Sequence, residues 1–166
     1  MPGHPLTEEF FKEVVEPTVD EYLARPEDIR RGRLAAIVLE HMIDYWHQDT
    51  HERKNAVRAA LRADTPIPNH PGYCSADIIR DLADANKHAK LGRKTPQPQL
   101  TDAGQVKQHC IGATGTAATG MVATGMLKPV DVLVTLNDGK SFGLVYAVRQ
   151  AAEAWRKKLG LAQARP

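Results

Sequence analysis

The densest group of side chains that could do chemistry lies between positions 80 and 88. Asp81, Asp84 and His88 follow one another at steps of three and four residues, which places them on one face if the segment is a helix. A carboxylate one turn before an imidazole can orient the ring and raise its basicity. Arg80, beside them, carries the planar guanidinium that suits a phosphate. We therefore take Arg80, Asp84 and His88 as candidate catalytic residues, although an exposed, salt-bridged helix face would explain the same spacing.

A second polar stripe occurs earlier in the chain. Its members follow at steps of four, three and four residues, namely Glu40, Asp44, His47 and His51. Carboxylate and imidazole groups together suit zinc or another divalent cation. Asp44, His47 and His51 are therefore candidate metal ligands, which a second helix would have to complete. The alternative is a solvated polar face. His41 stands nearer the apolar side, as either an interior histidine or a base.

Complete cofactor or catalytic signatures are missing from the rest of the sequence. Cys74 and Cys110 stand far apart and match no metal or redox spacing. The glycines between positions 112 and 125 lack the flanking strand and helix of a dinucleotide-binding turn. Partners of a Ser-His-Asp type meet only in the folded chain, so spacing cannot nominate them. The sequence requires no cofactor, and the identity of any bound cofactor is open.

Helices have to position these candidates. Apolar residues recur at helical spacing in five segments, which begin and end near Thr7–Leu23, Pro26–His47, Glu52–Leu61, Ser75–Leu91 and Val148–Leu159. Thr7 and Ser75 are expected to cap their helices. Pro17 should either kink the first helix or begin a second segment. The second helix is apolar around most of its circumference, so we expect it to be the central, most buried one.

A β-hairpin is predicted near the C-terminus. Residues 130–136 and 140–146 alternate between apolar and polar, and Asn137-Asp138-Gly139 lies between them. A three-residue loop with Gly139 in the left-handed conformation sets Val134 opposite Phe142 and Val132 opposite Leu144. The hairpin should pack on the helix that follows it, because an isolated hairpin is marginal in water.

Residues 92–129 show little apolar periodicity and are rich in Gly, Thr, Ala, Pro and Gln. A structureless loop of this length is unusual inside a compact domain. The segment could be a flexible flap, a disordered insert, or one weak strand around Met121–Leu127.

Composition places the chain among ordinary globular proteins. It has 166 residues, of which 42% are apolar and 25% charged. The net charge of +2 is too small to argue for a polyanionic partner. The N-terminus has neither the basic start nor the apolar run of a signal peptide, and no run of eighteen apolar residues occurs. We therefore expect a cytoplasmic protein that does not span a membrane.

One stretch carries a resemblance to known proteins. Asp81–His88 resembles a helix segment of small bacterial helical proteins of unknown function. More distantly, it is similar to HEPN domains, helical bundles that often act as ribonucleases in defence and toxin systems. Their signature is an Arg, four to six intervening residues, and then a His on a late helix. Here seven residues separate Arg80 from His88, and Asp81 stands in place of the usual Asn. The resemblance implies RNA as a substrate, and a homodimer or a folded cleft that brings these groups to a phosphate.

The expected fold is α+β and mainly α, with four or five helices, a C-terminal β-hairpin and a final helix. We expect one domain over 1–166, with a helical bundle at 6–91, a flexible Gly/Thr/Pro-rich segment at 92–129, and the hairpin and helix at 130–160. Two functions are open. The first is a non-catalytic interaction or structural module of bacterial or phage origin, which could be a homo-oligomer. The second is a HEPN-like ribonuclease or nucleotide-handling domain that uses Arg80, Asp84 and His88.

Overall fold

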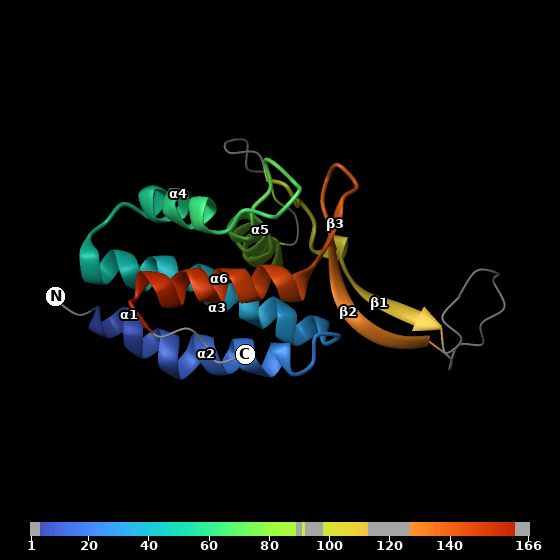
Figure 1. Cartoon of the computed structure of the whole chain (residues 1–166), viewed down its shortest axis with the longest axis horizontal. Helices are drawn as coiled ribbons and strands as arrows, with labels where there is room; N and C mark the ends of the chain where they lie inside the picture. Colours follow the sequence, from blue (N-terminus) through green and yellow to red (C-terminus); the bar gives the residue numbers. More distant parts are fainter. Residues whose placement is uncertain (1–3, 89–90, 92–97, 113–126, 162–166) are drawn as a thin grey trace.

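The computed structural model describes residues 4–88, 91, 98–112 and 127–161. The fold is α+β and mainly α, as predicted: a body of packed helices carries a small three-stranded antiparallel sheet at one end. Figure 1 shows α3 and α6 side by side through this body, with α1 and α2 along one flank and α4 on the other. Among the residues that the structure describes, no helix has both the length and the hydropathy needed to cross a bilayer.

The first helical stretch is interrupted at its centre. Helix α1 covers Pro5–Phe10, a π-helical turn covers Phe11–Val15, and α2 covers Glu16–Leu23. Pro17 stands at the beginning of α2, so it begins a second segment. Because proline has no N–H for the usual helical bond, the wider turn before it accommodates the missing donor. Thr7 does not cap this stretch as predicted, since it lies inside α1 and is buried.

Helix α3, Ile29–Thr50, is the central helix that the sequence predicted. It begins at Ile29, later than predicted, because Asp28 caps it: the Asp28 carboxylate accepts from the N–H groups of Arg30 and Arg31 at 3.0 and 3.1 Å. It ends beyond the predicted His47, where His51 takes the left-handed conformation with φ 59°. Its buried face carries Gly32, Ala35, Ala36, Leu39, Glu40, Met42, Ile43 and Trp46.

Helices α4, Lys54–Asp64, and α5, Ser75–His88, follow. Both were predicted, with α4 beginning and ending slightly later than expected. Ser75 is the first residue of α5. The proline-rich link between them returns through a bridge between Pro66 and Cys74. The predicted continuation of α5 beyond His88 lies outside the described residues, apart from Leu91, which is not helical.

The sheet has the order β1-β2-β3, with β1 Val106–Gly112, β2 Leu127–Thr135 and β3 Ser141–Gly143. The predicted register is confirmed, because Val134 pairs with Phe142 and Gly139 has φ +85°. The predicted pair of Val132 with Leu144 is wrong, since Leu144 already begins helix α6, Leu144–Lys158. Leu144 is fully buried, so the chain turns early into a helix that covers the core.

Strand β1 corrects the prediction for residues 92–129. Val106–Gly112 pairs with β2 over its whole length, from Val106 opposite Val134 to Gly112 opposite Leu127. The weak strand predicted around Met121–Leu127 falls outside the described residues up to position 126. Backbone hydrogen bonds to β2 hold β1 in place, although the residues of β1 do not alternate between apolar and polar. The periodicity of the sequence cannot reveal such backbone pairing.

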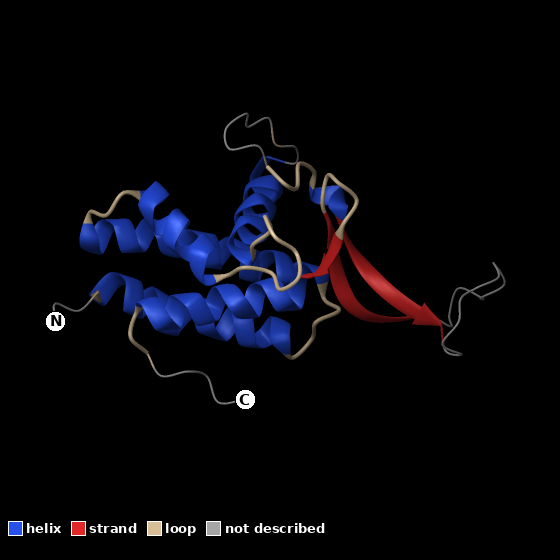
Figure 2. Cartoon of the chain, turned by 45° about the horizontal axis from the view of Figure 1, so that its top comes forward, coloured by secondary structure: helices blue, strands red, loops and turns tan. Residues whose placement is uncertain are grey.

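The core lies between α2, α3, α5 and α6, with the inner face of the sheet base at one end. Its largest fully buried side chains include Trp155, Tyr22, Phe11, Leu39 and Met42. Figures 1 and 2 show that β1 and β2 form a two-stranded arm whose far end lies beyond the helices. Only the base of this arm therefore shares the core.

Candidate functional site

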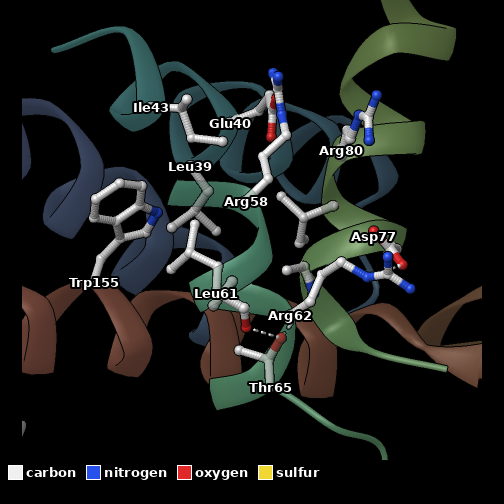
Figure 3. Close-up of a pocket in the computed structure, with 13 residues that line it drawn as sticks. Leu39, Glu40, Ile43, Arg58, Leu61, Arg62, Thr65, Asp77, Arg80 and Trp155 are labelled. Atoms are coloured by element: carbon white, nitrogen blue, oxygen red, sulfur yellow. Dashed lines mark hydrogen bonds and ion pairs between the residues drawn. The ribbon is translucent and has the colours of Figure 1, made fainter. Parts of the chain in front are cut away.

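The candidate site is a pocket at the junction of α3, α4, α5 and α6. Figure 3 shows its apolar floor and the charged side chains around it. The floor is formed by Leu39, Ile43, Leu61, Ile79 and Trp155, and the charged groups are Glu40, Arg58, Arg62, Asp77 and Arg80. A pocket with an apolar floor and a few convergent polar groups is the usual setting of a small-molecule site.

Glu40 is the buried acid of this pocket, with only 8% of its surface exposed. Arg58 of α4 donates to Glu40 Oε1 from Nη2 at 2.6 Å and from Nε at 3.2 Å. Burial raises the pKa of Glu40 above its ordinary value, while the hydrogen bonds and charge of Arg58 act to lower it. A carboxyl with a perturbed pKa in a pocket is typical of functional sites, and also of structural ion pairs.

A second ion pair crosses from α4 to α5. Nε of Arg62 lies 3.0 Å from Oδ2 of Asp77. The charge of Asp77, together with a hydrogen bond to Cys74, raises the pKa of Arg62. Cys74 itself is buried, and burial raises the pKa of its thiol. This thiol is therefore protonated at neutral pH and is a poor nucleophile.

The structure places Arg80 and Asp84 near Glu40, whereas His88 does not line the pocket. Arg80 lines the pocket, and Asp84 is half-buried and close enough to Glu40 to act on its pKa. Arg80 and Asp84 each interact with a neighbouring group. His88 is exposed at the last residue of α5. Eight residues along a helix correspond to about 12 Å, so His88 and Arg80 stand more than two turns apart.

The predicted outward polar face of Asp81, Asp84 and His88 is wrong for Asp81. Only 2% of the surface of Asp81 is exposed. Asp81 Oδ2 accepts from the backbone N–H groups of Gln99 and Leu100, at 2.6 and 3.4 Å. Asp81 therefore fixes the segment that leads into β1, and it does so from the same helix that carries Arg80.

The three predicted metal ligands each have a different environment. Asp44 pairs with Lys54 Nζ at 2.6 Å, and His47 Nδ1 lies 2.7 Å from the backbone oxygen of Glu52. His51 is exposed at the end of α3. Among the described residues, no group of three or more His, Cys, Asp or Glu side chains is arranged to hold a metal ion. The side chains of Asp44, His47 and His51 therefore do not form a metal site in the described part of the chain. His41, the other histidine of α3, is half-buried.

Sequence reasoning missed the arginines of α4. Lys54, Arg58 and Arg62 recur every four residues, and Val57 and Leu61 lie between them. On α3, Asp44 and Glu40 are also four residues apart, and they pair in order with Lys54 and Arg58. The matching spacing was present in the sequence, but nothing there indicated that these two helices face each other.

The comparisons with known proteins identify no relative: no family model, no curated protein and no solved structure matches this chain. In its present form the pocket leaves a free volume of about 20 Å³, which is room for one water molecule. Its arginines can bind an oxyanion, since a guanidinium presents five donors in a fixed plane.

Proposed function

We propose that the chain is a non-catalytic interaction module that self-associates through the outer edge of β1. The observation that carries this proposal is the position of β1 at the edge of the sheet, on an arm that extends beyond the helices. An edge strand presents backbone N–H and C=O groups that can pair with another strand. Addition of a strand to such an edge is a recurring mode of recognition.

The two edges of the arm differ in their capacity for pairing. On the β2 side, β3 occupies Leu133, Val134 and Thr135, and Pro129 lacks a backbone N–H. Val106–Gly112 contains no proline. The outer edge of β1 is therefore the more continuous of the two.

Pairing with a second copy would also support the arm. A two-stranded ribbon is marginal in water, and additional strands that share a hydrophobic face stabilise it. At the base, Val106, Val132 and Val134 are buried, and the Gln108 amide donates to the backbone oxygen of Glu27 at 2.7 Å. A second β1, added antiparallel, would extend the sheet to four strands along the part of the arm beyond this base.

The charges on β1 favour a second copy of itself. The strand contains one lysine and no carboxylate. In a two-fold antiparallel pairing centred on His109, Lys107 of one copy faces position 111 of the other. The two lysines are then not directly opposite, and the like-charge repulsion that destabilises cross-strand pairs is avoided.

The experiment is sedimentation velocity of the purified chain across a wide range of concentration. We expect a reversible dimer. His109→Pro and Cys110→Pro remove N–H groups that point to opposite edges of β1, because successive N–H groups alternate along a strand. The variant that loses the outward donor should be monomeric while β1–β2 pairing persists by hydrogen exchange, and Gln48→Ala on the exposed side of α3 should remain dimeric. A wild-type monomer at every concentration would sink the proposal.

Nucleotide handling at Arg80, Asp84 and His88 is the second candidate function. Its support is the position of Arg80 in the pocket and of Asp84 beside Glu40. Such an enzyme should cleave RNA, and His88→Ala should abolish the cleavage without changing the fold. Intact RNA after long incubation with purified protein would remove this candidate. For either function we propose a cytoplasmic location, which suits the free thiols of Cys74 and Cys110.

A further inference from the structure

We propose that the outer surface of α1, the π-helical turn and α3 binds a basic amphipathic helix of another protein, whose apolar stripe is flanked by lysine or arginine. This inference goes beyond the proposed association through β1 and involves none of its residues. It rests on apolar side chains that the fold leaves exposed and on carboxylates beside them. We call this surface the α1–α3 face. Its apolar members are Leu6, Phe10, Val14, Leu34, Val38 and Tyr45.

The α1–α3 face is apolar although much of it is exposed. Leu6, Val14 and Leu34 keep 45%, 38% and 42% of their surface. Among the side chains that the structure describes, Tyr146 is the only other large apolar one of similar exposure. Single exposed apolar residues are ordinary, but a group of them on one surface, rimmed by polar residues, marks an interaction site.

The two helices form one surface because they run antiparallel and pack along each other. At one end the rings of Phe10 and Tyr45 stack, with centroids 4.0 Å apart and planes 7° from parallel. Towards the other end, Arg31 Nε lies 3.9 Å from Glu21 Oε2. Val14 follows Phe10 by one turn, so it lies between these two contacts. Figures 1 and 2 show α1 and α2 along the same flank of α3.

The exposed stripe of α3 lies on the side opposite the core. Leu34, Val38, His41 and Tyr45 follow at steps of four, three and four residues, which places them on one side of the helix. The residues of α3 that are buried in the core occupy the other side. From Leu34 to Tyr45 the stripe covers about three turns, or roughly 17 Å. A partner helix can lie against a stripe of this length with its apolar residues at i, i+3, i+4 and i+7.

Carboxylates border this face on the α1 side. Glu9, Glu13 and Asp20 follow at steps of four and seven residues, and all three are exposed. No basic side chain pairs with them in the part of the chain that the structure describes, whereas their neighbour Glu8 pairs with Lys12 at 3.4 Å. Carboxylates without a partner, next to an apolar stripe, attract a helix that carries lysine or arginine along one flank of its own stripe.

Arg30 determines which way round the partner lies. It is exposed and stands one turn before Leu34, at the end of the face away from Phe10. Arg30 repels a basic side chain placed there, so the basic flank of the partner has to lie over Glu9 and Glu13. The same two carboxylates argue against an anionic membrane as the occupant, because they repel its lipid phosphates.

The test measures binding of fluorescent peptides to the full chain by anisotropy. The probe is a peptide of leucine and lysine, about five turns long as a helix, with its leucines at i, i+3, i+4 and i+7. One control peptide has the same composition with the leucines scattered, and the other has glutamate in place of lysine. We expect saturable binding of the probe and binding at least tenfold weaker for both controls. No binding of the probe, or equal binding of either control, would overturn the proposal.

Variants locate the binding surface. Leu34→Gln and Val14→Gln should each weaken binding of the probe about tenfold, because each removes an apolar anchor. Both positions are exposed, so the fold should tolerate the change, and circular dichroism verifies this. Tyr146→Gln, on α6 and outside the face, is the matched control of similar exposure and should bind as the wild type does. If folded Leu34→Gln and Val14→Gln both bind at wild-type strength, this face is not the site.

Two other occupants are tested with the chain alone. If Leu34→Gln alters the sedimentation of the wild-type chain, a second copy covers the face. If the wild type co-sediments with vesicles of phosphatidylcholine and phosphatidylglycerol and Leu34→Gln does not, a lipid surface covers it. Either result contradicts a partner helix. The β1 variant that loses its outward donor should bind the probe as strongly as the wild type, so this inference is tested separately from association through β1.

Discussion

Thr7 and Asp49 join the first helix to the end of the central one. The Thr7 hydroxyl and the Thr7 backbone N–H both donate to Asp49 Oδ2, at 2.6 and 2.8 Å. Thr7 is fully buried, so its polar groups have no access to water and depend on this carboxylate. Burial is the largest single influence and acts to raise the pKa of Asp49, but the hydrogen bonds from Thr7 and from the Leu6 N–H, together with the charge of His4, hold the pKa below its ordinary value.

Replacing Thr7 by valine should therefore lower stability at neutral pH. We expect a loss of about 1–2 kcal/mol in the free energy of unfolding, because the side-chain bond to a charged acceptor disappears. The contribution of Asp49 is present above its unfolded pKa, near 4, and is lost as pH falls through its lower folded pKa. Denaturant titrations should thus show the largest deficit at pH 7 and a smaller one near pH 2. Thr7→Ser keeps the hydroxyl and is the control.

Replacing Arg58 should give a deficit in stability that also shrinks as pH falls, but over a higher range of pH than the deficit of Thr7→Val. Arg58→Leu leaves the buried Glu40 carboxylate without its partner, which we expect to cost about 2–4 kcal/mol at pH 7. Burial raises the folded pKa of Glu40 above its unfolded value, so the penalty is full above the folded pKa and disappears as pH falls below the unfolded one. The deficit of Arg58→Leu should shrink between pH 7 and pH 4. In the Arg58→Leu/Glu40→Gln double variant, the deficit in unfolding free energy should not vary with pH, because glutamine has no carboxyl to titrate.

Asp81 should be a structural residue, and its removal should affect the segment that it holds. Asp81→Ala leaves the N–H groups of Gln99 and Leu100 without their acceptor, and Leu100 is fully buried. We expect a loss of about 2–3 kcal/mol and faster hydrogen exchange at Leu100. Asp81→Asn retains an acceptor oxygen and should lose less. Wild-type exchange at Leu100 in Asp81→Ala would contradict the assigned role.

Gly32 should resist substitution even though it lies inside a helix. A Cβ at this position would stand 2.7 Å from Leu144 Cδ2 and 3.0 Å from Tyr22 Cε2. Alanine is favoured over glycine in helices by about 1 kcal/mol, but both neighbours are fully buried and have to shift. We expect Gly32→Ala to lower the unfolding free energy by about 1–2 kcal/mol overall. A rise in thermal stability would show that α2 and α6 can separate from α3 at little cost.

The helical segments and the hairpin turn could be predicted from local sequence because their signals are local. The period of 3.6 residues marks the apolar side of α3, where Leu39, Met42 and Ile43 are buried. Likewise, the order Asn-Asp-Gly selects the turn that aligns Val134 with Phe142. Each of these features depends on residues within one or two turns of one another, so the chain itself carries the information.

Other features depend on which distant segments meet. Strand β1 exists because β2 supplies its hydrogen-bond partners, and its own residues show no apolar alternation. Leu144 begins helix α6 and is fully buried in the core, although the alternation of apolar and polar residues favoured a strand at this position. Spacing placed Asp81 beside Asp84 and His88, yet Asp81 is covered by the segment at Gln99 and Leu100.

The sequence by itself determined the helical segments and the hairpin turn, because propensity, capping and turn chemistry act over a few residues. Tertiary structure decided the site. Arg58 reaches Glu40 from eighteen residues away, and Arg80 joins them from another helix. These long-range contacts form because whole helices pack together. The energy of that packing is the sum of many apolar contacts, so no single residue predicts it.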